Sequence, residues 1–128
     1  MRMADEAAAL AAIKHSRRRV VTVAMDRMNF LYPIYVGELV TLRATVNAAW
    51  RTSMEVGVRV EAENVRTREV RHTNTAYITM VSLDDDGRPA EVPPNDASSA
   101  AEVRRQREAE LRRANRLAER DQILTQRG

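Results

Sequence analysis

Two stretches of strictly alternating residues in the middle of the chain constrain its fold more than any other feature. Over residues 40–48, and again over residues 54–62, an apolar side chain stands at every second position. Side chains of a strand point alternately to opposite faces, so each stretch predicts a long strand with one buried face. Only a few residues separate the stretches, which predicts an antiparallel hairpin with Glu55, Gly57 and Arg59 on its outer face.

An alanine-rich segment at residues 4–15 predicts a helix that packs against this hairpin. Its six alanines give it high helix propensity and would let the backbone of a sheet approach closely. At 3.6 residues per turn its apolar side chains fall on nearly all sides, so we expect protein to enclose the helix. Asp5 and Glu6 form an acidic pair within it, and one of these carboxylates is a candidate for a chemical role.

Two further strands and a loop are predicted on either side of the hairpin. β-branched residues predict a strand over residues 20–25 and a third long strand over residues 70–83. Both faces of the latter are partly apolar, so we expect its outer face to meet another surface, such as a second subunit. Residues 26–35 contain three of the five aromatic side chains and Pro33, which predicts a loop packed as a lid over the core or around an apolar ligand.

The C-terminal segment predicts a charged helix. Ser99 and Glu102 have the spacing of a capping box, and the helix would run to about residue 124. Its thin apolar stripe favours a solvated helix laid against the body or a neighbouring subunit over an RNA-binding or membrane-binding arm.

Composition excludes several classes of site and partner. The chain has 128 residues, enough for one domain, and no cysteine, which excludes disulfides, thiolate metal sites and cysteine nucleophiles. The first 98 residues hold 13 basic and 13 acidic side chains, so the net charge of +3 lies in the tail and argues against nucleic-acid binding. The chain has no run that could span a bilayer and no signal peptide, so we expect a cytoplasmic protein without a membrane partner.

Metal-binding patterns are missing as well. The three aspartates at residues 84–86 lack the ligand spacing and closing glutamate of a calcium loop and predict a solvated turn. His15 and His72 have no metal-ligand spacing, so we expect both to be structural and no metal to be bound.

Four motifs, in order, resemble one enzyme family. They read ADEAAALAAIKH, VVTVAMDRMNFLYPIYVGELV, RTSMEVGVRVEAEN and TNTAYITMVSLDDDGRPAEVPP. They are similar to segments of the hotdog-fold acyl-CoA thioesterases, specifically the cytosolic, brain-type acyl-CoA hydrolase group and its small bacterial homologues. The resemblance covers nearly the whole chain.

This resemblance implies an α+β hotdog fold, in which an antiparallel sheet wraps around one central hydrophobic helix and a peripheral helix follows. The hotdog domain would occupy residues 1–94 and the charged helix residues 95–128. In relatives a first strand and a Gly-Gly turn precede the central helix, and neither is found here. We therefore expect a truncated product or a mis-assigned start, with weak or no activity, and a homo-oligomer in which dimers assemble to a hexamer.

The implied activity is hydrolysis of fatty acyl-CoA to free fatty acid and CoA, without a metal or organic cofactor. Asp5 matches the catalytic aspartate of the relatives' helix and would act as general base or nucleophile, with Glu6 left as a helix-surface or interface residue. The alternative role for Asp5 is to complement the positive end of the helix dipole. The alternative function is a catalytically impaired hotdog module that binds acyl-CoA or serves as an oligomeric assembly unit.

Two segments are the implied substrate contacts. Arg51, Thr52 and Ser53 resemble the family's nucleotide-contacting segment, where guanidinium and hydroxyl groups suit phosphate oxygens. An ordinary polar turn is the alternative for these three residues. Asn29 and Phe30 lie in the apolar loop that would flank the pantetheine or the acyl chain.

Overall fold

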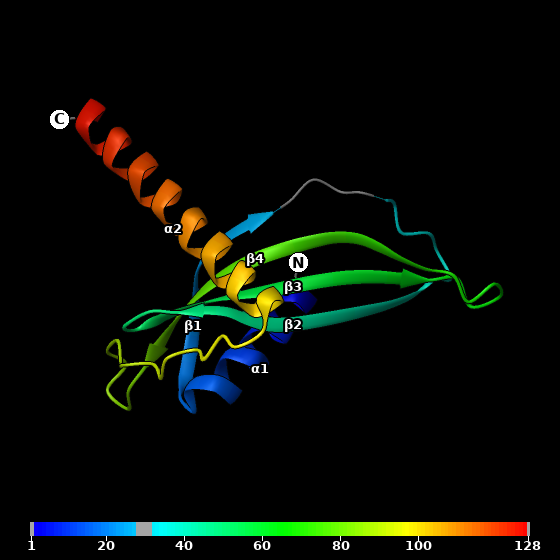
Figure 1. Ribbon diagram of the computed structural model, residues 1–128, viewed down its shortest axis with the longest axis horizontal. Coiled ribbons are helices and arrows are strands. Elements are labelled where there is room, and N and C mark those ends of the chain that lie inside the picture. Colours follow the sequence, from blue (N-terminus) through cyan, green and yellow to red (C-terminus); the bar gives the residue numbers. More distant parts are fainter. Residues whose placement is uncertain (1, 28–31, 128) are drawn as a thin grey trace.

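The computed structural model describes residues 2–27 and 32–127, which form an α+β arrangement of two helices and four strands (Figure 1). The elements are, in chain order, α1 (Arg2–Ser16), β1 (Arg19–Arg27), β2 (Leu39–Ala49), β3 (Ser53–Glu63), β4 (Val70–Leu83) and α2 (Ala100–Arg127). Each predicted helix and strand is present, and no end is displaced by more than three residues.

The four strands form one antiparallel sheet in the order β1-β4-β3-β2. The predicted hairpin is confirmed, since β2 pairs with β3 from Leu39↔Glu63 to Ala49↔Met54. β4 pairs with β3 from Val70 to Val81 and with β1 on its other side, so β1 and β2 are the edge strands. Among the described helices, none has an apolar stretch long enough to cross a bilayer.

α1 packs on one face of the sheet through its smallest side chains. Ala4, Ala8 and Ala12 are at most 2% exposed and lie one helical turn apart, so they form a single stripe. This stripe contacts the inward side chains of β3 and β4, which include Met54 and Ile78, both fully buried. α1 contacts all four strands, because a helix surface made of methyl groups lets the backbones come close.

The expectation that protein encloses α1 on nearly all sides is wrong for this chain. Met3, Leu10 and Ile13 are 61%, 66% and 42% exposed. The reason is geometric: one sheet covers one side of a helix, and these three side chains point away from the alanine stripe. The chain therefore presents an apolar surface on the side of α1 that faces away from the sheet.

α2 lies on the opposite face of the sheet, so the outer face of β4 is partly covered within the same chain. Figure 1 shows α2 crossing the sheet with its N-terminal half and extending past it with its C-terminal half. The capping box is confirmed: the Glu102 N–H donates to Ser99 Oγ at 3.1 Å, and the Ser99 N–H donates to Glu102 Oε1 at 3.2 Å.

One expectation about this face is confirmed and another is wrong. As expected, α2 is a largely solvated helix laid against the body, although Leu111 and Leu117 of its apolar stripe are 61% and 44% exposed. Glu55, expected on the solvated outer face of the hairpin, is completely buried. The cause is that arginine side chains of α2 dock on the sheet and Arg112 pairs with Glu55.

The loop before β2 does not pack over the core. Tyr32, Tyr35 and Val36 are each more than half exposed, so the predicted lid is wrong for the described part of the loop. A polar contact holds it instead: Glu38 accepts a hydrogen bond from Arg71 Nη2 at 2.7 Å and another from the Tyr35 N–H at 2.7 Å. The hydrogen bond from Arg71, followed by that from Tyr35, holds the pKa of Glu38 below its ordinary value.

Candidate active site

Asp5 lies at the first turn of α1, beside the edge strand β1. Its side chain is partly exposed, and its Oδ1 accepts a hydrogen bond from the Thr22 hydroxyl at 3.3 Å. The buried residues Ala4 and Ala8 bring this turn close to the sheet, and Asp5 projects sideways from their stripe toward β1. The carboxylate is thus fixed on one side and open to solvent on the other, which suits a group that acts on a bound molecule.

The position of Asp5 also fits the simpler role. The first turn of a helix carries the positive end of its dipole, which a carboxylate stabilises. This contribution needs no substrate, so the geometry of Asp5 is compatible with both roles.

The tight connection between β2 and β3 is formed by Arg51, Thr52 and Ser53. Their backbone carbonyls accept hydrogen bonds from other parts of the chain. The Trp50 N–H donates to the Ser53 carbonyl at 2.8 Å, closing the turn. The Thr52 carbonyl accepts from the Ser82 N–H, and that of Arg51 from Val92, both at 2.9 Å. The Arg51 side chain is exposed, so a rigid turn presents a guanidinium to solvent.

The structure does not bring Asp5 and this turn together. The turn lies near the C-terminal end of α1, because Val92 bonds Arg51 and the next residue, Pro93, contacts His15 Nε2 at 2.8 Å through its carbonyl. Asp5 is ten residues earlier in the helix, which corresponds to about 15 Å along the axis. A ligand that touches both groups of one chain must therefore be extended.

The remaining predicted residues are two loop residues proposed to bind substrate and the histidines expected to be structural. Asn29 and Phe30 lie outside the described residues. His72 Nε2 contacts the Asn74 carbonyl at 3.0 Å and Thr75 Oγ1 at 2.7 Å, as expected of a structural histidine. In the part of the chain that the structure describes, no three histidine, aspartate or glutamate side chains gather as metal ligands would.

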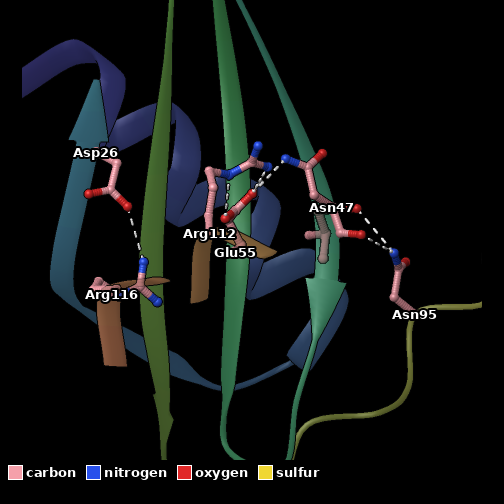
Figure 2. A network of polar contacts seen from close by, with 7 residues as sticks. Asp26, Asn47, Glu55, Asn95, Arg112 and Arg116 are labelled. Atoms are coloured by element: carbon pink, nitrogen blue, oxygen red, sulfur yellow. Dashed lines mark hydrogen bonds and ion pairs between the residues drawn. The ribbon is translucent and has the colours of Figure 1, made fainter. Parts of the chain in front are cut away.

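A buried polar network beneath α2 is the feature that the sequence did not reveal. Figure 2 shows Arg112 of α2 reaching Glu55 of β3, with Nε–Oε2 at 3.0 Å and Nη2–Oε1 at 2.5 Å. The Asn47 side chain donates to the same carboxylate at 3.1 Å. The neighbouring Asn95 side chain donates to the carbonyls of Val46 and Asn47, tying the segment before α2 to the sheet.

Local features of the sheet create this network. A bulge between Val46 and Ala48 leaves Asn47 as the extra residue of β2. Gly57 then makes room for it, because a Cβ at that position would lie 2.7 Å from Asn47 Nδ2. Burial acts to lower the pKa of Arg112, but the hydrogen bond and charge of Glu55 outweigh it and raise that pKa. The arginine therefore stays charged against Glu55.

Comparison with known proteins decides the family. A sequence profile described as "Thioesterase superfamily" matches residues 1–69, which is more than half of the chain. The chain belongs to the thioesterase superfamily. This thioesterase-superfamily chain is 36% identical over 105 residues to Protein VdlD of Helicobacter pylori, and the match covers 82% of this chain and 60% of VdlD. It thus spans about 60% of the length of that relative.

Solved structures agree with the family and the fold. A crystal structure described as an apo-hexameric acyl-CoA thioesterase superposes with a TM-score of 0.84 and 38% identity, covering 90% of this chain and 74% of the other. The acyl-CoA hydrolase of Staphylococcus aureus, solved with butyryl coenzyme A and coenzyme A, has a TM-score of 0.81 and 32% identity, covering 97% and 78%. The predicted hotdog fold and the resemblance to acyl-CoA thioesterases are confirmed.

Proposed function

We propose that this chain is an acyl-CoA thioesterase that hydrolyses fatty acyl-CoA to free fatty acid and CoA. The observation that carries the proposal is a partly exposed carboxylate, Asp5, set on the central helix of a hotdog fold and hydrogen-bonded by Thr22. Relatives described as acyl-CoA hydrolases share this fold at 32–38% identity, one of them in complex with coenzyme A and an acyl-CoA. No metal or organic cofactor is proposed.

Asp5 would act in one of two ways. As general base it takes a proton from water, whose oxygen attacks the thioester carbonyl. As nucleophile its carboxylate attacks that carbonyl and forms a mixed anhydride, which water then hydrolyses. In both cases the carbon–sulfur bond breaks, the thiolate of CoA leaves and takes up a proton, and the acid is released.

The remaining predicted residues would bind the substrate. Arg51, Thr52 and Ser53 are proposed to contact the phosphates of CoA, and Asn29 and Phe30 to flank the pantetheine or the acyl chain. Asp5 and the turn at Arg51 lie toward opposite ends of α1, whose ten residues from Asp5 to His15 span about 15 Å, and this separation fits CoA, whose phosphates and thioester lie at opposite ends of a long arm.

Self-association is proposed as part of the function. Val21 and Val23 of the edge strand β1 are 43% and 57% exposed, and α1 carries exposed apolar side chains of its own, Met3, Leu10 and Ile13. A second copy would bury this surface, and one similar structure is described as hexameric. We propose dimers assembling to a hexamer, and light scattering after gel filtration tests this. Val23→Lys should lower the measured mass, whereas Val65→Lys, in an exposed loop, should not change it.

The catalytic proposal is tested by comparing Asp5→Asn with Glu6→Gln in release of free thiol from palmitoyl-CoA. Asn keeps an oxygen for Thr22 but cannot take a proton, so kcat should fall by about a hundredfold or more, while the adjacent Glu6→Gln stays near wild type. Wild-type activity in Asp5→Ala would exclude Asp5 from catalysis.

A binding measurement beside the hydrolysis assay tests the alternative that the chain is a binding module. The position of Asp5 at the positive end of the helix dipole favours this alternative. Calorimetry with the substrate analogue palmitoyl-CoA thioether measures binding without turnover. A chain that binds the thioether but releases no thiol from palmitoyl-CoA is a binding module.

A further inference from the structure

A second concave site lies on the face of the sheet opposite to α1, beside the first turns of α2. Its volume is about 420 Å³. Two sheet residues and three residues of α2 contribute guanidinium groups, and one acidic residue lines it. They are Arg43 and Arg59, Arg104, Arg105 and Arg112, and Glu108. We refer to this site as the arginine pocket.

The sheet side of the arginine pocket carries an opposed pair of like charges. Arg43 of β2 and Arg59 of β3 are direct cross-strand partners, an arrangement that normally destabilises a sheet. One carboxylate serves both: Glu61 lies 2.6 Å from Arg43 Nε and 3.6 Å from Arg59 Nε. The two arginine side chains remain 68% and 53% exposed, so the chain leaves them able to bind an anion.

The α2 side adds charge that the described residues do not fully neutralise. The guanidinium of Arg104 has no hydrogen bond or ion pair within residues 2–27 and 32–127, and its side chain is exposed. Glu108 acts on Arg112, which already pairs with Glu55. The three guanidinium groups of Arg43, Arg59 and Arg104 therefore share two carboxylates, Glu61 beside the sheet pair and Glu108 in the pocket lining.

The floor of the arginine pocket is lined by polar side chains. Thr45, Gly57 and Tyr77 form one row across β2, β3 and β4, next to the row that holds Arg43 and Arg59. The Asn47 side chain fills the space over Gly57, where a Cβ would lie 2.7 Å from Asn47 Nδ2. Asn47 and Thr45 thus add small polar groups to a basic lining, which suits phosphate oxygens.

We infer that the arginine pocket binds an oligophosphate group, as carried by a nucleotide, held between Arg43 and Arg59 of the sheet and Arg104 of α2. Three guanidinium groups around one cavity call for a ligand with several negative charges, and the planar guanidinium matches phosphate oxygens in pairs. Because the ligand joins sheet to helix, it also fastens α2 to the body and stabilises the folded chain.

This site is separate from the proposed catalytic one. Asp5 belongs to α1, which packs on the face that carries Met54 and Val56, whereas Arg59 alternates with them onto the other face. A substrate at Asp5 does not place its phosphates in the arginine pocket of the same chain. The phosphates bound in the arginine pocket therefore come from a free nucleotide or from a CoA molecule bound to another copy of the chain.

Calorimetric titration of the chain with sodium tripolyphosphate, ADP and CoA tests the inference. We expect binding of tripolyphosphate and ADP that weakens as NaCl is raised. Arg59→Gln/Arg104→Gln removes two charges but keeps the shorter Arg43–Glu61 pair, and it should weaken binding by about tenfold or more. The control Arg66→Gln/Arg88→Gln removes two exposed arginines elsewhere and should stay within about twofold.

Loss of ligand binding can be separated from a folding defect and from loss of thioesterase activity. Circular dichroism and the Tm without ligand show whether both double variants fold, and the wild-type Tm should rise with ADP while that of Arg59→Gln/Arg104→Gln does not. If CoA competes with ADP for the arginine pocket, the pocket holds the phosphates of CoA. If ADP binds there whether or not CoA is present, the pocket holds a free nucleotide. Equal weakening in both double variants, or no binding of either probe, overturns the inference whatever the hydrolysis assays give.

Discussion

Arg112 of α2 and Glu55 of β3 form a two-point ion pair against the sheet, although 57 residues separate them in the sequence. Glu55 is fully buried, while the Arg112 side chain is 22% exposed and stacks over the ring of Tyr77, 3.5 Å from its centroid. Arg113 lies over Trp50 and Arg116 pairs with Asp26, so three arginines on one face of α2 hold the helix. The attachment of α2 is therefore polar at its centre.

Arg112→Ala should destabilise the chain because it leaves the Glu55 carboxylate buried without its cation. Breaking a buried pair costs about 3 to 5 kcal/mol, and we expect about 3 because Arg112 is partly exposed. Urea unfolding followed by the fluorescence of Trp50, the single tryptophan, measures the loss and reports on docking of α2.

Two further variants separate this effect from a general change in α2. Arg107→Ala removes an exposed arginine from the same helix and should change the free energy of unfolding by less than about 0.5 kcal/mol. Glu55→Leu/Arg112→Leu removes both charges and should recover most of the loss. Equal stability of Arg112→Ala and Arg107→Ala would contradict a structural role for the pair.

The sequence predicted the elements well because their signals are local. Alternation defined β2 and β3, β-branched residues defined β1 and β4, and alanine content defined α1. What surrounds each element depends on contacts between distant segments, which periodicity does not contain. Glu55 follows the outward pattern of β3, and only the docking of Arg112 from α2 makes that position buried. Leu10 is apolar yet exposed, because the chain supplies one sheet face for α1.

The candidate site was predictable only through the family resemblance. Asp5 stands out in an apolar helix, but its Thr22 partner comes from β1 and no short-range pattern links the two. The arginine pocket was hidden for a similar reason: Arg43, Arg59 and Arg104 look like separate solvated residues until the sheet register and α2 bring them together. The bulge at Asn47 and Gly57, whose missing side chain leaves room for Asn47, were likewise not recognisable as a pair in the sequence.

Thr22→Val should lower kcat if Asp5 is the catalytic group. The Thr22 hydroxyl orients the carboxylate through one hydrogen bond, and such a bond contributes about 0.5 to 1.5 kcal/mol, or roughly two- to twelvefold in rate. Thr22→Ser keeps the donor and should restore most of kcat. Steady-state kinetics with palmitoyl-CoA should show the change in kcat with little change in KM, and an equal loss in both variants would assign Thr22 to packing alone.

Ala8→Leu should destabilise the chain because α1 lies too close to the sheet for a larger side chain. Ala8 is fully buried within the alanine stripe, and overpacking of a filled core costs about 1 to 3 kcal/mol. Lys14→Leu adds the same side chain at an exposed position of α1 and should stay within about 0.5 kcal/mol of wild type. Urea unfolding measures both, and an equally stable Ala8→Leu variant would contradict close packing of α1.

The capping box of α2 should make stability depend on pH through Glu102. Hydrogen bonding by the side chain and then the backbone of Ser99 holds the pKa of Glu102 below its ordinary value of 4.5. A carboxyl group whose pKa is lower in the folded state adds stability above its unfolded pKa, and this is lost as the pH falls through the folded value. Glu102→Gln keeps the capping contacts without titrating, so the stability advantage of wild type over it should shrink below about pH 4.5. Urea unfolding at several pH values measures that difference; Glu119→Gln, an exposed control in the same helix, should run parallel to wild type, and parallel curves for Glu102→Gln would contradict the role of Glu102.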